Sequence, residues 1–155
     1  MSLIKQAGNL DNYPSRISCS HMIPSCFPKV SQSEKLELLQ LFIELSKDDT
    51  PMVRRAVASN LNSLVNLLDK IKAKSELLPI WVRLSRDSFD SVKIKAIENS
   101  SFLLESLSKQ EASEILVEMI KNSDPENKSW RVRYALAEIL PNMITFVGKT
   151  KKIKL

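Results

Sequence analysis

Three side chains near the start of the chain are of the types that bind metals or attack substrates: Cys19, His21 and Cys26. A structural zinc site takes four such ligands at characteristic spacings, and no fourth candidate is near these three in sequence. On a helix, positions 19 and 26 share a face while position 21 points elsewhere. His21 is the only histidine, and the sequence offers it no plausible nucleophile and acid partner. We therefore expect buried thiols, a surface histidine, no metal and no cofactor.

Other common routes to catalysis find no support either. The chain has two glycines and no glycine-rich phosphate loop. Its carboxylates fall on helix faces expected to be exposed, where solvation is the default; examples are Glu34, Glu37, Glu44, Glu98 and Glu105. We expect the chain not to be an enzyme.

A second candidate is the aromatic and basic run WRVRY, from Trp130 to Tyr134. Such runs are typical of surfaces that bind single-stranded nucleic acid. If Val132 belongs to a hydrophobic core, however, only Trp130 and Arg131 remain at an exposed turn. A large aromatic residue and an arginine are among the residues most enriched at protein-binding hot spots. We favour protein binding here; the alternative is that Trp130 packs on the neighbouring turn.

The element that would position this run occurs three times. A polar turn at residues 48–50 precedes Val53, and similar turns precede Val92 and Val132, so that the three valines lie 39 and 40 apart. A basic residue follows each valine: Arg54, Lys93 and Arg133. In the first copy, Thr50 is suited to accept a hydrogen bond as a helix N-cap, and Pro51 fits the first helical position.

From each valine, residues continue in steps of three and four along one helical face, and all but Ser100 are apolar. The three series are Val53, Val57, Leu61, Leu64 and Leu68; Val92, Ala96, Ser100, Leu103 and Leu107; and Val132, Leu136, Leu140, Met143 and Val147. Each helix has an apolar partner upstream, in residues 33–47, 75–86 and 110–122. Leu38, Leu77 and Leu116 are 39 apart, as are Phe42, Trp81 and Ile120. The extra residue of the second helices falls in the third turn, where insertions belong.

A period near 40 with two helices per unit predicts an all-α fold, an α-solenoid of HEAT repeats. We expect a partial repeat over residues 1–31, full repeats over 32–70, 71–108 and 109–148, and a basic tail over 149–155. Prolines within the predicted helices (Pro24, Pro79 and Pro141) would bend them around the stack. Neither end has the polar capping unit that an isolated solenoid needs, so the chain resembles a window cut from a longer array.

The net charge of +5 is concentrated at one end of the chain. Lys149, Lys151, Lys152 and Lys154 lie in the last seven residues; without them 19 basic residues face 18 acidic ones, a net of +1. We therefore expect no nucleic-acid partner and a solvated tail. No run of about 18–20 apolar residues indicates a membrane span, and two cysteines suggest a reducing compartment. We expect a cytoplasmic protein, present also in the nucleus as an open alternative.

Two turn motifs carry a resemblance to a known family. Residues 48–56 (DDTPMVRRA) and 128–134 (KSWRVRY) closely resemble turns of the scaffold subunits, also called regulatory subunits of the A class, of type 2A serine/threonine protein phosphatase. Residues 90–93 look like the intervening turn, with Lys93 where the family usually has arginine. Residues 13–16 and 26–30 are similar to the preceding repeat. The resemblance spans roughly residues 3–147 and would correspond to the end of the fourth repeat and the fifth to seventh.

In that family the turns within each repeat form a ridge that grips other subunits. The resemblance implies contacts to a B-type regulatory subunit from Tyr13, Asp49, Thr50, Pro51, Met52, Arg54, Arg55, Asp87, Ser88, Phe89, Asp90, Ser129, Trp130 and Arg131. It places the catalytic subunit on repeats absent here, so we do not expect this chain to bind it. Arg54, Lys93 and Arg133 could instead pair with Asp48 and Asp87 between adjacent repeats and fix their relative rotation.

Two other functions remain open from the sequence. One is a different HEAT adaptor, similar to nuclear-transport solenoids, which uses its inner helices for contacts. A weaker one is nucleic-acid binding through the lysine tail. Binding that survives changes in the turns would favour the first, and salt-sensitive binding that disappears with residues 149–155 would favour the second.

Overall fold

A computed structural model describes residues 2–8, 11–100, 107–121 and 129–148. Within them the chain is helical and contains no strand. The elements are α1 (Ser2–Gly8), α2 (Tyr13–Cys26), the 3₁₀ turn η1 (Phe27–Lys29), α3 (Gln32–Leu45), α4 (Pro51–Val65), α5 (Lys70–Lys72), the π-helical turn η2 (Ala73–Leu77), α6 (Leu78–Ser85), α7 (Asp90–Glu98), α9 (Lys109–Lys121) and α10 (Trp130–Gly148). The position Leu103 and the predicted insertion near residues 124–127 lie outside the described residues.

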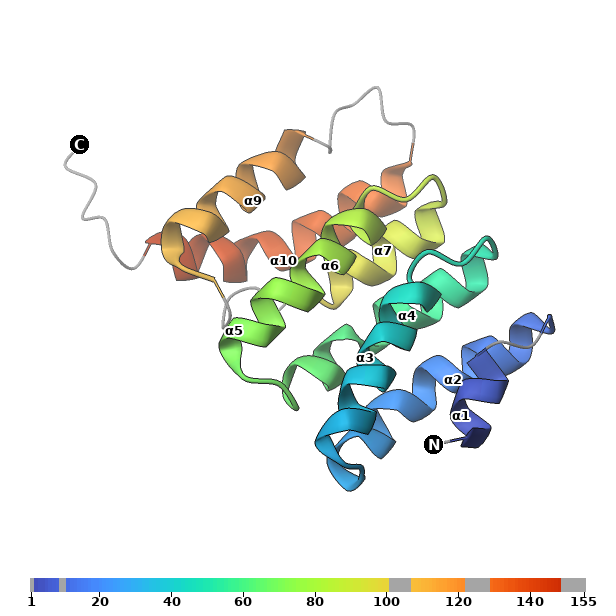
Figure 1. The fold of residues 1–155 in the computed structure, drawn as a ribbon. Helices are drawn as coiled ribbons and strands as arrows, with labels where there is room; N and C mark the ends of the chain where they lie inside the picture. Colours follow the sequence, from blue (N-terminus) through green and yellow to red (C-terminus); the bar gives the residue numbers. More distant parts are fainter. Residues whose placement is uncertain (1, 9–10, 101–106, 122–128, 149–155) are drawn as a thin grey trace, which may run out of the picture.

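The helices stack as hairpins in one direction. The second helices form one layer, in which α2 packs on α4, α4 on α7 and α7 on α10, while α3, α6 and α9 form the other layer (Figure 1). This is the α-solenoid that the repeat period predicts. None of the helices that the structure describes is long and apolar enough to cross a bilayer.

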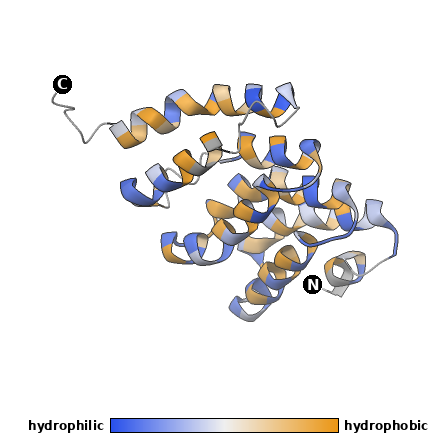
Figure 2. Cartoon of the chain, turned by 90° about the horizontal axis from the view of Figure 1, so that it is seen from above, coloured by the Kyte–Doolittle hydropathy of each residue, from blue (hydrophilic) through white to orange (hydrophobic). Residues whose placement is uncertain are grey.

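The hydrophobic core runs through the stack in the predicted register. Val53, Val92 and Val132 are all buried, and so are Leu38, Leu77 and Leu116 in the partner helices. The apolar sides of neighbouring helices face one another, and hydrophilic residues lie outside (Figure 2). Ser100, the polar exception in the series, is buried as well. Equivalent positions in different hairpins therefore have equivalent environments, because each hairpin buries its apolar face only against its neighbours.

One position of the register is wrong. Phe42 and Trp81 are buried, whereas Ile120 is 49% exposed, and Met119 is buried in its place. The buried stripe of α9 is narrow and runs along Ala112, Leu116 and Met119, spaced as i, i+4 and i+7. Ile120 lies about 100° around the helix from Met119 and falls outside that stripe.

Local sequence explains where several helices begin and bend. Ser31 forms a capping box with Glu34: the Ser31 hydroxyl accepts from the Glu34 amide, and the Glu34 carboxylate accepts from the Ser31 amide at 2.9 Å. The helix predicted over 75–86 begins earlier, at Lys70, and widens into the π turn η2 before Pro79. Because Pro79 has no amide hydrogen, it cannot bond the carbonyl four residues earlier, and the π turn η2 lies immediately before it in the same helix. Pro24 and Pro141 lie inside helices as predicted.

Candidate functional site

The N-terminal ends of α2, α4, α7 and α10 lie along one edge of the molecule, at the right of Figure 1. We call this edge the turn ridge. Each end carries one large exposed side chain: Tyr13 is 48% exposed, Met52 47%, Phe89 50% and Trp130 60%. Large apolar side chains that recur at one edge and remain half-exposed are unlike isolated surface residues, and such patches mark contact sites.

Behind the exposed row, two arginine–aspartate pairs join consecutive hairpins. Arg16 of α2 donates to both carboxylate oxygens of Asp48, from Nε at 2.6 Å and from Nη2 at 3.1 Å. Arg54 of α4 repeats the geometry on Asp87, at 2.6 and 3.0 Å. The side chains are 17% and 10% exposed in the first pair and 14% and 6% in the second. Paired donors on two oxygens fix orientation as well as distance, so each pair sets how one hairpin sits on the next.

The same carboxylates also shape the turns in which they lie. Asp48 accepts from the amide of Thr50 at 2.8 Å, and Asp87 accepts from the amide of Phe89 at 2.9 Å. This is the turn in which an aspartate side chain bonds the backbone two residues ahead. Thr50 therefore begins α4 without a side-chain cap, contrary to the prediction. Its hydroxyl instead accepts from Arg16 at 3.3 Å, because the guanidinium already lies over the turn.

Both carboxylates are held in their charged form. Burial opposes ionisation of Asp48, but the Arg16 guanidinium and the Thr50 amide outweigh it and keep the pKa of Asp48 below its ordinary value. Burial likewise opposes ionisation of Asp87, and Arg54 with the Phe89 amide lowers the pKa of Asp87. The pairing also raises the pKa of Arg16 and of Arg54. The four groups thus remain charged under neutral conditions.

The third junction is built differently. Lys93, at the position of Arg54, contacts Asp90 of its own helix at 3.3 Å. A hydrogen bond from Ser129, at the start of α10, is the main cause that lowers the pKa of Asp90, and Lys93 adds to it. The link between α7 and α10 on the ridge therefore involves a carboxylate and a hydroxyl. The turn preceding Ser129, where a further aspartate-like partner would be sought, lies outside the described residues.

The structure thus divides the fourteen residues that the sequence singles out. Arg54, Asp87, Thr50, Asp90 and Ser129 take part in contacts between hairpins. The exposed ones are Tyr13, Asp49, Met52, Ser88, Phe89, Trp130 and Arg131, while Pro51 and Arg55 are half-buried. All lie on or next to the turn ridge. Whether any of them touches a partner stays a prediction.

Two of the exposed aromatics rest on guanidinium groups. The Arg54 guanidinium carbon lies 5.8 Å from the centre of the Phe89 ring, which belongs to the next hairpin. The Arg131 guanidinium carbon lies 5.2 Å from the centre of the Trp130 ring. Such contacts stabilise an aromatic ring in one orientation while leaving its other face accessible. Trp130 is therefore supported by its own neighbour and remains 60% exposed.

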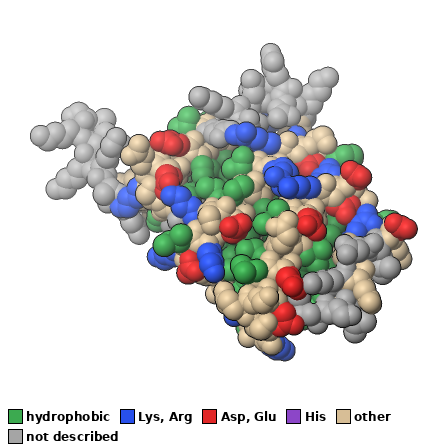
Figure 3. Space-filling model, in the orientation of Figure 1, with side chains coloured by type: hydrophobic (Ala, Val, Ile, Leu, Met, Phe, Trp, Pro, Cys, Tyr) green, Lys and Arg blue, Asp and Glu red, His purple; other side chains and the backbone are tan. Residues whose placement is uncertain are grey.

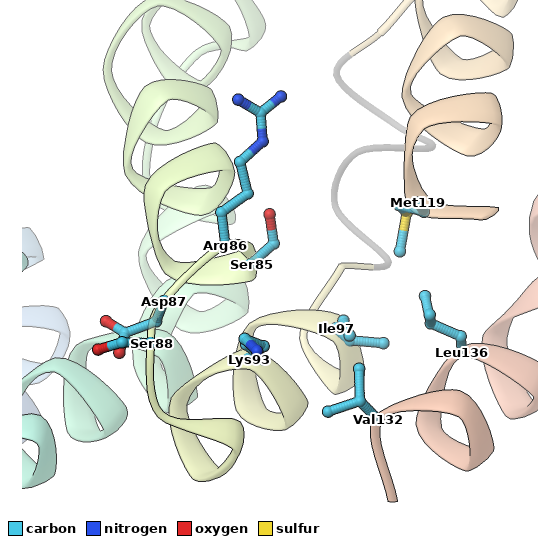
Figure 4. Close-up of a pocket in the computed structure, with 9 residues that line it drawn as sticks. All are labelled: Ser85, Arg86, Asp87, Ser88, Lys93, Ile97, Met119, Val132 and Leu136. Carbon is cyan, nitrogen blue, oxygen red and sulfur yellow. The ribbon is translucent and has the colours of Figure 1, made fainter. Parts of the chain in front are cut away.

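A cavity of about 360 Å³ lies behind the ridge, between α6–α7 and the last hairpin (Figure 4). Ile97, Met119, Val132 and Leu136 converge on its apolar side, and Lys93 lies at its edge. It is large enough for one apolar side chain of another molecule.

Cys19 and His21 have the predicted surroundings, whereas Cys26, predicted to be buried, is only half-buried. Cys19 is buried, and burial raises the pKa of its thiol to about 11, which makes it a poor nucleophile. His21 is exposed, and its Nδ1 lies 2.9 Å from the Asn60 amide nitrogen of α4. Within the described residues no group of histidine, cysteine, aspartate and glutamate side chains could hold a metal ion.

Sequence reasoning missed Arg16 as a member of the junctions. The available signal was its spacing, because Arg16, Arg54, Lys93 and Arg133 follow one another at intervals of 38, 39 and 40. The stripe of the first helix is interrupted by Ser18 and Ser25, which made its register harder to align.

Comparisons with known proteins agree with this architecture. The HEAT repeat family matches residues 38–68. The chain is 40% identical over 67 residues to the human beta isoform of the serine/threonine-protein phosphatase 2A 65 kDa regulatory subunit, a match covering 43% of this chain and 11% of that protein. It is 36% identical over 67 residues to the protein phosphatase PP2A regulatory subunit of Saccharomyces cerevisiae, covering 43% and 11%. A probable PP2A regulatory subunit of Caenorhabditis elegans is 35% identical over 68 residues, covering 44% and 12%. These matches confirm the resemblance to phosphatase 2A scaffold subunits over 43–44% of the chain.

Proposed function

Because the chain is a solenoid of HEAT-type hairpins similar to a segment of phosphatase 2A scaffold subunits, we propose that it is a non-catalytic scaffold that binds a B-type regulatory subunit through the turn ridge. The matched relatives are named as regulatory or scaffold subunits. The match covers 11% of the length of the human relative, so the identity of the partner is proposed from the family resemblance, and the ridge supplies the surface that would bind it.

The observation that carries the proposal is the separation of tasks on the ridge. The charged groups of the ridge pair with one another at the junctions between hairpins, Arg16 with Asp48 and Arg54 with Asp87. The large side chains beside them remain about half-exposed, and Phe89 and Trp130 each rest one ring face on an arginine. A rigid row of side chains, held at one repeat spacing, can bind a large partner through several modest contacts with little loss of conformational entropy.

Trp130 is the expected centre of the contact. It is the most exposed of the four, its ring is held by Arg131, and the cavity behind the ridge is lined by Val132 of the same helix turn. Tryptophan and arginine are enriched at protein-binding hot spots, and a tryptophan buries a large area with little loss of side-chain freedom.

The test is a quantitative pull-down with B-type regulatory subunits. We expect Trp130→Ala to weaken binding roughly tenfold or more, and Met52→Ala and Arg55→Ala to weaken it less. Ile144→Ala is the matched control, because Ile144 is similarly exposed but lies near the end of α10 opposite to Trp130, away from the helix ends that form the ridge. Equal binding by the Trp130, Met52 and control variants would contradict the proposal and favour an adaptor that uses another face.

A further inference from the structure

Two shallow grooves lie side by side on the layer formed by α3, α6 and α9, and neither is lined by a residue of the turn ridge. The first, which we call the acidic groove, lies between α3 and the η2–α6 segment and has a volume of about 600 Å³. Leu36 and Ile43 form part of its apolar wall, and Glu37, Glu44 and Glu76 line it. No lysine or arginine is among its described lining residues.

The second, the basic groove, lies on the α5–α6 segment and has a volume of about 580 Å³. Ile71, Leu78 and Pro79 form its apolar part, and Lys70 and Lys74 line it. Lys74 forms an ion pair with Glu111 of α9. Lys70 is therefore the lysine of this groove that we expect to meet a carboxylate of a partner. The α5–α6 segment runs between α3 and α9, so it separates the two grooves (Figure 1).

Each groove carries an unusually exposed apolar side chain. Leu36 is 57% exposed in the acidic groove, and Ile71 is 82% exposed in the basic one. Figure 3 shows this face, where hydrophobic side chains gather between acidic and basic ones. A contiguous apolar surface with charged rims marks a protein contact, because burying apolar area in an interface lowers the free energy.

We propose that this face binds a second copy of the chain, with the acidic groove of each copy over the basic groove of the other. The two copies are related by a two-fold axis that lies in the interface, parallel to α6. Rotation about this axis places the acidic groove of each copy over the basic groove of the other, so that opposite charges meet at both contacts. Such an isologous interface requires one surface to be complementary to itself. The two grooves satisfy that requirement, because one supplies carboxylates, the other ammonium groups, and both supply apolar side chains.

Charge complementarity is the reason for choosing a second copy as the occupant. An acidic apolar groove alone would suit any basic amphipathic segment. Here the matching basic apolar surface lies on the same chain, beside it and on the same face. Opposed charges across an interface favour this pairing over one that places like charges together.

The first test measures the mass of the full chain in solution as its concentration rises, by light scattering and sedimentation. We expect a dimer, and Ile71→Glu should weaken self-association roughly tenfold or more, because it places a charge at the most exposed apolar contact. Ile144→Glu is the matched control: Ile144 is 54% exposed on α10 and lines neither groove. A chain that remains monomeric at high concentration, or an equal loss in both variants, would overturn the proposal.

The second test reverses the charges of one groove at a time. Glu37→Lys with Glu44→Lys makes both grooves basic, and Lys70→Glu with Ser75→Glu makes both acidic while leaving the Lys74–Glu111 pair intact. Each double variant should fold, as checked by circular dichroism, yet self-associate more weakly than the unchanged chain. An equimolar mixture should form a mixed dimer, since both contacts are then complementary. The absence of a mixed dimer would contradict the proposal. So would an acidic groove that binds a basic peptide but not a second copy of the chain. Neither groove contains a ridge residue, so regulatory-subunit binding is tested separately.

Discussion

The junctions between hairpins are of two kinds, although all of them occur at equivalent positions of the repeat. The first two are closed by Arg16 on Asp48 and Arg54 on Asp87, each through two hydrogen bonds between largely buried side chains. At the third, Lys93 contacts Asp90 of its own helix, and Asp90 meets Ser129 of the next hairpin. A lysine is a point charge without the planar fork of arginine, so it cannot set an orientation through two bonds. The stack is therefore expected to be held more firmly in its first part than in its last.

The largest effect is expected from removing the arginine of the second junction. Arg54→Ala leaves the Asp87 carboxylate largely buried without its guanidinium, and we expect a loss of about 2–3 kcal/mol in the free energy of unfolding. Lys93→Ala, at the equivalent position, should cost only about 0.5–1 kcal/mol, since its contact is local and Asp90 is well exposed. Urea denaturation followed by circular dichroism measures both. Equal losses would remove the distinction between the junctions.

Acid should weaken the first two junctions selectively. The pKa of Asp48 and of Asp87 is lower in the folded chain than in the unfolded one, so their stabilisation is fully present above the unfolded value of about 3.9 and is lost as pH falls through the folded value. The melting temperature of the unchanged chain should exceed that of the Asp48→Asn, Asp87→Asn variant at neutral pH, and the gap should narrow below about pH 4.

Asp49→Asn is the matched control for this titration. Asp49 lies next to Asp48, but Arg54 meets its backbone carbonyl, at 3.0 Å, rather than its carboxylate. We expect this variant to lose much less stability at neutral pH than the Asp48→Asn, Asp87→Asn variant. A gap between the unchanged chain and the double variant that stays constant from neutral to acid pH would show that the two carboxylates do not stabilise the fold through their charge.

The smallest effect is expected at the third junction. Asp90→Asn keeps a hydrogen-bond acceptor for Ser129 but removes the charge that Lys93 contacts, so the loss should stay below about 1 kcal/mol. Thermal unfolding measures it directly. A loss as large as that of Arg54→Ala would mean that the third junction is as firmly closed as the second.

The fold followed from the sequence because a solenoid repeats its environments. Val53, Val92 and Val132 share a residue type since they share a buried position, and spacing alone aligned them. The period does not fix the rotation of each helix about its own axis, which is why the spacing aligns Ile120 with the buried Phe42 and Trp81 although Met119 is the buried residue.

The sequence predicted which residues lie on the ridge, but not which of them contact a neighbouring hairpin and which remain exposed. From the sequence, Arg54 and Asp87 could have faced a partner or each other. The distances between their side-chain atoms show that they face each other. Arg16 escaped notice because its helix has a weak apolar stripe, so its alignment with Arg54 had little support. Exposure of Met52, Phe89 and Trp130 depends on how closely successive hairpins approach, and no single hairpin contains that information.

The most direct test of the ridge as a binding surface is amide hydrogen exchange of the chain with and without a B-type regulatory subunit. The account predicts that the partner slows exchange at the starts of α4, α7 and α10, around Met52, Phe89 and Trp130, and leaves α3 and α6 unchanged. Protection confined to α3 and α6, or none at the helix starts while the partner is bound, would contradict it.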